Sequence, residues 1–136
     1  MPRFLITGGA GFIGSNLAHT LVACGESVRI LDDFSTGRMQ NLHGIEDRIE
    51  ILRGDIRHPA TVARAVEGIE IILHQAALNS NPRSIKEPEL TNAVNVAGTL
   101  GLLEAARAAN VRRVVYASSS SVYGDTPGLP KSEDMP

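Results

Sequence analysis

The sequence predicts an α/β fold built on a doubly wound parallel sheet, and three observations indicate it. Short apolar runs alternate with segments of helical periodicity along the chain. The first run leads into a glycine-rich turn, Thr7-Gly8-Gly9-Ala10-Gly11-Phe12-Ile13-Gly14, which opens onto a helical pattern. The second run ends in Asp32, eighteen residues after Gly14. Because alternating strands and helices form parallel sheets through right-handed crossovers, we expect five strands in the order 3-2-1-4-5.

The individual elements follow from the apolar pattern and its turn residues. We expect strands at residues 3–7, 27–32, 49–53, 69–74 and 112–118, and helices at residues 12–24, 59–67 and 87–109. Gly25 and Gly68 follow the first two helices and Pro59 begins the second, as is typical of helix termini. Residues 33–47 and the chain from 119 onward are predicted to be irregular. No domain boundary is visible, so residues 1–136 form one domain.

Composition excludes several classes of function. The chain has 136 residues, of which 43% are hydrophobic and 21% charged, which is typical of one globular domain with a real core. The formal net charge is −2 and the basic residues are scattered, so we expect no nucleic-acid partner. No apolar run is long enough for a membrane span, and the first residues lack a signal-peptide pattern.

The chain has a single cysteine, Cys24, which excludes a disulfide framework and a cysteine-based metal site. Its predicted role is a small buried hydrophobe in the first helix, on one stripe with Leu17 and Leu21. A reducing cytoplasm fits this cysteine usage. The four histidines show no metal-ligand spacing, so no metal is expected.

The predicted helix at 87–109 is apolar on two faces. One face carries Val94, Ala97, Gly101, Leu102, Ala105 and Ala109, and the other carries Ala93, Val96, Leu100 and Leu103. A helix that is apolar on two faces must be covered twice. The sheet is one cover. The other is either a further helix of the same subunit or the same helix of a partner, which predicts a homodimer as one of two alternatives.

The glycine turn is typical of a dinucleotide site. Gly8, Gly11 and Gly14 have the spacing that brings backbone N–H groups up to a pyrophosphate, in front of the positive end of a helix. Asp32 is placed to accept hydrogen bonds from the adenosine ribose and to repel a 2′-phosphate, which favours NAD over NADP. The alternative for Asp32 is an acid that caps a turn, and nearby Arg38 keeps NADP open. Strand, helix and acid together make the motif specific.

Two further motifs follow the third and fourth strands. In Gly54-Asp55-Ile56-Arg57, Asp55 offers an acceptor for the adenine amino group and Ile56 a surface for the ring, although the motif alone is an ordinary turn. In His74-Gln75-Ala76-Ala77, small residues let the backbone approach a ligand closely. His74 by itself is predicted to be packed and hydrogen-bonded rather than catalytic.

Polar residues on the long helix and after the fifth strand leave alternatives open. Asn95 and Thr99, four residues apart, face either a polar site or water. The run Ser118-Ser119-Ser120-Ser121 ends the last predicted strand. A serine there, beside a nicotinamide, would hydrogen-bond a substrate hydroxyl during hydride transfer; a solvated serine loop is the alternative.

In order and spacing these segments resemble the extended short-chain dehydrogenase/reductase family, over essentially all 136 residues. The resemblance rests on the glycine turn and on Leu31-Asp32-Asp33-Phe34-Ser35-Thr36-Gly37, Gly54-Asp55-Ile56-Arg57, His74-Gln75-Ala76-Ala77, Asn95-Val96-Ala97-Gly98-Thr99 and Ser118-Ser119-Ser120-Ser121-Val122-Tyr123-Gly124-Asp125. Within the family, the chain is most similar to NAD-dependent sugar-nucleotide 4-epimerases acting on UDP-glucose or UDP-N-acetylglucosamine. Residues 82–85 and 126–131 look like the UDP-N-acetylhexosamine branch.

The resemblance implies a Rossmann-type NAD domain and a role for each matching position. The residues implied in NAD binding are Gly8, Gly11, Phe12, Ile13, Gly14, Asp32, Asp33, Phe34, Ser35, Thr36, Gly37, Asp55, Ile56, Gln75, Ala76, Ala77, Asn95 and Ala117. Ser119 matches the catalytic Ser/Thr and also contacts the UDP-sugar substrate, together with Ser80 and Ser120. Asn79 and Asn81 depart from the family pattern, in which relatives usually carry Gly and Val.

Two comparisons within the family narrow the expected activity. Sugar 4,6-dehydratases carry an acidic pair where this chain has Ser120 and Ser121, so no general acid for water elimination is evident and epimerisation is favoured. The family's Tyr-x-x-x-Lys pair is also missing, because Ser120 follows Tyr116 by four residues and Pro127 follows Tyr123 by four.

We therefore expect the chain to be the N-terminal part of a UDP-sugar 4-epimerase that lacks its base and its substrate subdomain and is inactive alone. Three alternatives remain. The first is a non-catalytic NAD-binding module. The second is a family oxidoreductase, dehydratase or decarboxylase acting on another nucleotide sugar. The third is a truncated or proteolytic remnant.

Overall fold

Five parallel strands form the sheet of the computed structural model, which describes residues 2–125 and 127–135. The strands are β1 (Phe4–Thr7), β2 (Val28–Asp32), β3 (Ile49–Arg53), β4 (Ile71–His74) and β5 (Arg113–Tyr116). Their order in the sheet is β3-β2-β1-β4-β5, and every neighbouring pair is parallel. This confirms the predicted fold class and strand order, and it places the carboxyl ends of the strands along one edge.

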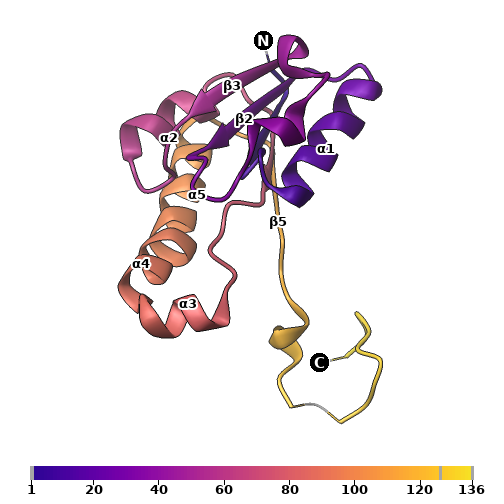
Figure 1. Ribbon diagram of the computed structural model, residues 1–136, viewed down its shortest axis with the longest axis vertical. Coiled ribbons are helices and arrows are strands. Elements are labelled where there is room, and N and C mark those ends of the chain that lie inside the picture. Colours follow the sequence, from indigo (N-terminus) through magenta and orange to yellow (C-terminus); the bar gives the residue numbers. More distant parts are fainter. Residues whose placement is uncertain (1, 126, 136) are drawn as a thin grey trace.

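The structure has five α-helices in the described residues, and three of them cover the two faces of the sheet. The five are α1 (Phe12–Ala23), α2 (Pro59–Val66), α3 (Asn81–Lys86), α4 (Pro88–Asn92) and α5 (Thr99–Ala108), with a π-helical segment, Ala93–Gly98, between α4 and α5. Helix α1 lies on one side of the sheet and helices α2 and α5 lie on the other (Figure 1). The chain after β5 runs away from the sheet toward the C-terminus (Figure 1).

The strands alternate their side chains between two hydrophobic clusters. Leu5 packs with residues of α2 and α5, whereas its neighbour Ile6 packs with residues of α1. In the same way Leu31 joins the first cluster and Ile30 the second. Because successive side chains of a strand point to opposite faces and both faces are covered, these strands are continuously apolar in the sequence.

The buried stripe of α1 differs from the predicted one. Its buried residues are Gly14, Ser15, Ala18 and Val22. The prediction that Leu17, Leu21 and Cys24 form the buried stripe was wrong. Leu17 and Leu21 are only partly buried beside the core, and Cys24 is exposed at the C-cap of the helix. Small side chains on the sheet side let α1 lie close to the glycine turn, and this close approach rather than the largest apolar residues decides which face is buried.

The irregular stretch predicted at 33–47 contains two 3₁₀ turns, Met39–Leu42 and Glu46–Arg48. Leu42 and Ile45 are buried in the cluster beneath α1. A third 3₁₀ turn, Ser120–Tyr123, lies in the stretch predicted to be irregular after 119. Such short turns carry too few residues for a periodic apolar pattern.

The helix predicted at 87–109 exists as a continuous helical segment, but its middle winds as a π-helix. Backbone angles stay in the right-handed helical region at both junctions, at Asn92 and at Gly98. On α5 the side chain of Leu102 is buried, whereas Leu100 on the other predicted apolar face is 60% exposed. Thus Leu102 packs on the sheet side as expected, with Val94 and Ala105 partly buried beside it. The prediction was wrong for the rest of this face, because its other members are exposed, namely Ala97, Gly101 and Ala109. The second apolar face is open in the described residues.

Helix α3 was not predicted. Its N-cap is Ser80, whose hydroxyl accepts a hydrogen bond from the backbone N–H of Arg83, and Pro82 occupies the first turn. Both features favour a helix start. The six residues of α3 are too few for an apolar stripe to reveal it.

Arg29 ties the sheet to the end of α2. From β2, its Nη1 donates to the carbonyls of Ala65 at 2.9 Å and Glu67 at 2.8 Å, and its Nε donates to the Glu50 carboxylate at 2.9 Å. The last carbonyls of a helix have no partner within the helix. The Arg29 side chain is only 11% exposed, whereas its partner Glu50 is 42% exposed, so the bond to the Ala65 carbonyl is the most shielded of the three.

We expect Arg29→Met to lower the free energy of unfolding by about 1–3 kcal/mol, because the last carbonyls of α2 lose a charged donor. Urea unfolding would measure this loss of stability.

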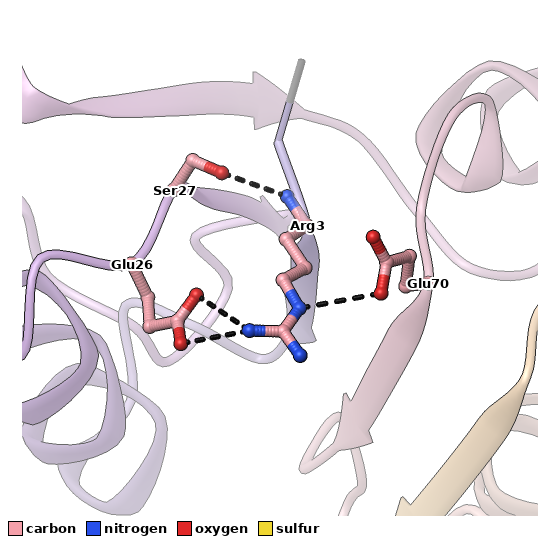
Figure 2. A network of polar contacts seen from close by, with 4 residues as sticks. All are labelled: Arg3, Glu26, Ser27 and Glu70. Atoms are coloured by element: carbon pink, nitrogen blue, oxygen red, sulfur yellow. Dashed lines mark hydrogen bonds and ion pairs between the residues drawn. The ribbon is translucent and has the colours of Figure 1, made fainter.

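Arg3→Met is the matched control. Arg3 lies just before β1, at the amino-terminal end of the sheet, between the carboxylates of Glu26 and Glu70 (Figure 2). Its side chain is 40% exposed, so its ion pairs contribute little and the loss should be the smaller one. An equal or larger loss in Arg3→Met would contradict the capping role of Arg29.

Candidate functional site

A cavity of about 550 Å³ opens at the carboxyl ends of β1 to β4. Its floor is the glycine turn after β1, which contributes Gly8, Gly11, Phe12, Ile13 and Gly14. All five belong to the predicted cofactor site, so the structure brings this part of the prediction together at one hollow. Binding at the carboxyl ends of the strands is the general rule for open α/β sheets.

Close backbone packing explains why the turn needs glycine. Gly8 has φ +68°, and a β-carbon there would lie 2.8 Å from the backbone nitrogen of Ala76. A β-carbon on Gly14 would overlap the carbonyl oxygen of Gly8. The N-cap of α1 is Gly11, and no side chain caps this helix end in the described residues. The first amides of α1 therefore start directly at the cavity.

The turn after β2 forms the second side of the cavity, with Asp32, Asp33, Ser35 and Thr36. Asp32 is 7% exposed, and its two carboxylate oxygens accept separate backbone N–H groups, from Ala10 at 2.9 Å and Phe34 at 2.8 Å. The carboxylate thus fastens the glycine turn to the β2 turn. Of the alternatives for Asp32, turn capping is present, and the carboxylate still borders the cavity.

Two predicted residues of this turn, Phe34 and Gly37, are not among the lining residues. Phe34 adopts φ +59°, and its ring packs beneath the guanidinium of Arg53 at 5.1 Å. Gly37 packs directly on Asp32, because a β-carbon there would lie 2.8 Å from the Asp32 Oδ1 atom. Both residues therefore shape the turn from behind the cavity surface.

Asp55 and Ile56, after β3, also line the cavity. The Asp55 carboxylate is held by its neighbour Arg57, whose Nε donates to Oδ2 at 2.8 Å and whose backbone N–H donates to Oδ1 at 2.8 Å. This hydrogen bonding keeps the pKa of Asp55 below its usual range, so the carboxylate stays ionised. Ile56 is buried, and its side chain packs on Gly98 of the π-helical segment.

Residues 75–78, called here the pocket wall, close the cavity on the β4 side. The backbone N–H groups of Gln75 and Ala76 each donate to the Thr7 hydroxyl at 3.3 Å. Asn95 holds the other end of the wall, because its side chain accepts from the Leu78 N–H at 2.8 Å and donates to the Leu78 carbonyl at 2.9 Å. Asn95 is therefore a clamp behind the pocket wall rather than a lining residue.

The buried side chain of His74 lies next to the pocket wall, between two hydroxyl groups. Its Nδ1 is 2.6 Å from the Thr7 Oγ1 atom and its Nε2 is 2.9 Å from the Thr99 Oγ1 atom. Burial lowers the pKa of the His74 imidazole. The prediction that His74 is packed and hydrogen-bonded is confirmed, and of the two environments left open for Asn95 the polar one is present.

The predicted substrate residues lie apart from this cavity in the described part of the chain. Ser119 and Ser120 line a separate hollow with Tyr123 and Lys131, on the segment that leaves the sheet after β5 (Figure 1). The Ser119 hydroxyl bonds to Ser121. Their catalytic and substrate roles stay predictions. The substrate role of Ser80, which caps α3, also stays a prediction. So does the NAD-binding role of Ala117, whose N–H donates to the His74 carbonyl. Thr126, in the motif at 126–131, lies outside the described residues.

Sequence reasoning missed several lining residues, namely Leu31, Gly54, Arg57, Leu78, Asn79, Arg83, Leu90 and Val94. Leu31, Gly54 and Arg57 stand inside motifs that were recognised, so their position one residue from a predicted ligand was the available signal. Arg83 and Leu90 come from α3 and α4, and nothing in their local pattern places them at a cavity. No helix of the described residues is long and apolar enough to cross a membrane.

Comparison with known proteins decides the family. A family model described as "NAD dependent epimerase/dehydratase family" matches residues 4–136. The chain belongs to this family. The resemblance to extended short-chain dehydrogenases/reductases is thereby confirmed, and NAD is the cofactor that the family's description names.

Several relatives of this family member are UDP-glucose 4-epimerases. The one from Mycolicibacterium smegmatis is 49% identical over 138 residues, which covers 98% of this chain and 44% of the relative. The one from Streptomyces lividans is 37% identical, covering 98% of this chain and 41% of the relative. The chain thus spans less than half the length of the curated relatives it matches.

Solved structures of similar proteins share the fold closely. A UDP-N-acetylglucosamine 4-epimerase from Methanobrevibacter ruminantium in complex with UDP-N-acetylmuramic acid has a TM-score of 0.88 at 33% identity, covering 98% of this chain and 43% of that one. A dTDP-glucose 4,6-dehydratase from Streptomyces venezuelae with NAD bound has a TM-score of 0.89 at 36% identity, covering 98% and 44%. Members of the family with different activities therefore share this domain.

Proposed function

We propose that this chain binds NAD in the cavity at the carboxyl ends of β1 to β4. The observation that carries the proposal is the glycine turn and the Asp32 carboxylate meeting at one hollow. The pyrophosphate would lie over the glycine turn, where the positive end of the α1 dipole favours an anion. The adenosine would lie toward Asp32 and Asp55, and the nicotinamide ribose toward the pocket wall.

The residues present fit this cofactor. Gly8 and Gly14 leave a backbone surface that a β-carbon would disturb, as a closely approaching pyrophosphate requires. Each Asp32 oxygen accepts one backbone N–H and keeps a further lone pair, so the carboxylate remains an acceptor for ribose hydroxyls. The ionised Asp55 carboxylate in turn remains an acceptor for the adenine amino group.

We further propose that the longer protein is a UDP-sugar 4-epimerase. When bound, NAD would supply a group that accepts a hydride from C4 of the sugar and can give it back to the opposite face of the same carbon. Ser119 would hydrogen-bond the reacting sugar hydroxyl, and Ser80 and Ser120 would contact the sugar. Support comes from the epimerase relatives and from Ser120 and Ser121 standing where dehydratases have acids.

A homodimer in the cytoplasm belongs to the same proposal. Its support is the open apolar face of the helix, where Val96, Leu100 and Leu103 are 60%, 60% and 45% exposed. Large apolar side chains gathered on one exposed face commonly mark a contact surface.

Two measurements test the proposed function. Calorimetry with the 136-residue chain should show NAD binding at least about tenfold tighter than NADP binding, because Asp32 repels a 2′-phosphate. Absence of NAD binding would overturn the first proposal.

A chain extended through the Tyr-x-x-x-Lys helix should convert a UDP-hexose or UDP-N-acetylhexosamine to its 4-epimer. The 136-residue chain, which contains no such pair, should show no turnover. An extended chain that forms no epimer from any UDP-sugar would contradict the second.

A further inference from the structure

Thr7, His74 and Thr99 form a buried chain of hydrogen bonds that crosses from the sheet to α5. Thr7 ends β1 and His74 ends β4, and the two are direct neighbours in the strand register. Thr99 begins α5, where the π-helical segment ends. Thr7 is fully buried and His74 is 7% exposed. These hydrogen bonds lie directly behind the pocket wall and have no role in the chemistry proposed above.

The position of every proton in this series of hydrogen bonds follows from the groups at its two ends. The carbonyl oxygen of Asn95 only accepts, so the Thr99 hydroxyl, 2.7 Å away, donates its one proton to it. Toward His74 the Thr99 oxygen must then accept, which places a proton on His74 Nε2. His74 Nδ1 is correspondingly the acceptor of the neutral ring, and the Thr7 hydroxyl donates to it at 2.6 Å.

Thr7 has no further capacity, which fixes the state of His74. Its oxygen already accepts the Ala76 N–H and shares the Gln75 N–H, which also donates to the Thr7 carbonyl at 3.0 Å, and these two approaches occupy both lone pairs. A proton on His74 Nδ1 would confront this saturated oxygen and leave the Thr7 hydroxyl proton without its acceptor. The lowered pKa of His74, caused by burial, agrees with a neutral ring.

We propose that Thr7, His74 and Thr99 act as a positioning relay, in which the Nε2–H tautomer of His74 holds the pocket wall in its cofactor-binding shape. The relay sets one end of the wall through Thr7, while Asn95 clamps the other end at Leu78. The wall faces the glycine turn at close range, as the 2.8 Å approach of a Gly8 β-carbon to Ala76 shows. A shift of the wall would therefore change the width of the cavity between them.

The relay gives Thr99 an effect on backbone amides that it does not touch. Without the Thr99 hydroxyl, the His74 Nε2–H is left without an acceptor, and the imidazole loses the contact that holds its Nδ1 against Thr7. The Thr7 hydroxyl then loses its fixed acceptor, and the wall loses a firm anchor. π-Helical segments, such as the one that Thr99 closes, are frequent at functional sites.

The test uses Thr99→Val, which removes the hydroxyl at nearly constant shape, in the 136-residue chain. The matched control is Thr91→Val, because the Thr91 hydroxyl makes the same bond to the carbonyl four residues earlier, Glu87, in α4 without a histidine partner. Thr99→Ser is the rescue variant, since it keeps the hydroxyl. Circular dichroism checks that each variant is folded.

Three readouts are expected to move together. Nitrogen-15 NMR of the imidazoles should show His74 as the Nε2–H tautomer at neutral pH in the unmodified chain and in Thr99→Ser, with the Nε2 signal shifted in Thr99→Val, where this N–H has no acceptor. Hydrogen exchange at the Ala76 amide should accelerate in Thr99→Val alone, whereas the Gln75 amide keeps its bond to the Thr7 carbonyl. NAD binding should weaken about tenfold in Thr99→Val and stay near the unmodified value in Thr91→Val, because a buried N–H left without an acceptor disfavours the binding shape.

The inference rests on the proposed NAD binding only through the third readout. If the unmodified chain binds no NAD, the proposed function fails, while the tautomer and the amide exchange still decide on the relay. The relay itself is overturned if His74 is charged or carries its proton on Nδ1 in the unmodified chain. It is equally overturned if hydrogen exchange at the Ala76 amide is as slow in Thr99→Val as in Thr91→Val. If Thr99→Val does not fold, the tautomer of His74 in the unmodified chain decides whether the relay is correct.

Discussion

Gly14→Ala should lose NAD binding and lower the free energy of unfolding by about 3 kcal/mol, the largest effect expected for a single methyl group in this chain. The added β-carbon would overlap the Gly8 carbonyl oxygen and lie 2.8 Å from the Gly9 α-carbon. All of its nearest atoms belong to the backbone, so no side chain can rotate away. Helix α1 or the glycine turn must move, and either shift displaces the amides that face the pyrophosphate. Urea unfolding and calorimetry with NAD measure the two effects.

Gly101→Ala is the matched control for this change. Gly101 lies in α5, and a β-carbon there meets nothing within 4 Å. Alanine favours a helix over glycine, so this variant should gain about 0.5–1 kcal/mol in stability and keep its NAD affinity. Equal behaviour of Gly14→Ala and Gly101→Ala would show that close packing at the glycine turn is unimportant.

Asp32→Asn should weaken both the fold and the preference for NAD. The Asp32 carboxylate accepts one N–H on each oxygen, from Ala10 and Phe34, whereas an asparagine presents only one oxygen and turns an N–H₂ group toward the other donor. One backbone N–H is left unpaired, which should lower the free energy of unfolding by about 2 kcal/mol. Loss of the negative charge should also narrow the difference between NAD and NADP affinities.

Asp47→Asn provides the comparison for the loss of one carboxylate charge. Asp47 is exposed in a 3₁₀ turn and is not among the residues that line the cavity. Its stability should stay within about 0.5 kcal/mol of the unmodified chain, as is usual for surface substitutions. If Asp32→Asn is as stable as Asp47→Asn, the fastening role of Asp32 is wrong, and an unchanged ratio of NAD to NADP affinity would refute its part in cofactor choice.

Much of the site could be predicted because it is built from backbone at strand ends. The carboxyl ends of parallel strands share one edge, so the residues after β1, β2, β3 and β4 had to meet there once the order was known. Gly8, Asp32, Asp55 and Ala76 accordingly line one cavity as expected. Ser119 follows β5 by the same logic, yet in the described residues it lies at a separate hollow, because the segment that carries it runs away from the sheet.

Other features depend on partners that are distant in sequence. The pattern around Asn95 left two environments open, and only the approach of Leu78 decides that its amide is a clamp. Likewise the predicted stripe of α1 missed Gly14 and Ala18, because helix packing here follows the space left by the glycine turn. Arg83 enters the cavity from α3, a helix whose start is a local cap rather than an apolar period.

The sequence by itself determined the parallel sheet, its strand order and the dinucleotide-type glycine turn, since these follow from local alternation of apolar runs, glycine spacing and chain connectivity. Only the tertiary structure decided how the polar groups behind the cavity are paired. The tautomer of His74 and the double anchoring of the pocket wall depend on hydrogen-bond partners up to 69 residues apart in sequence, at Thr7 and Ala76. Hydrogen bonds act over about 3 Å, so no pattern along the chain reveals them until the fold has brought the groups together.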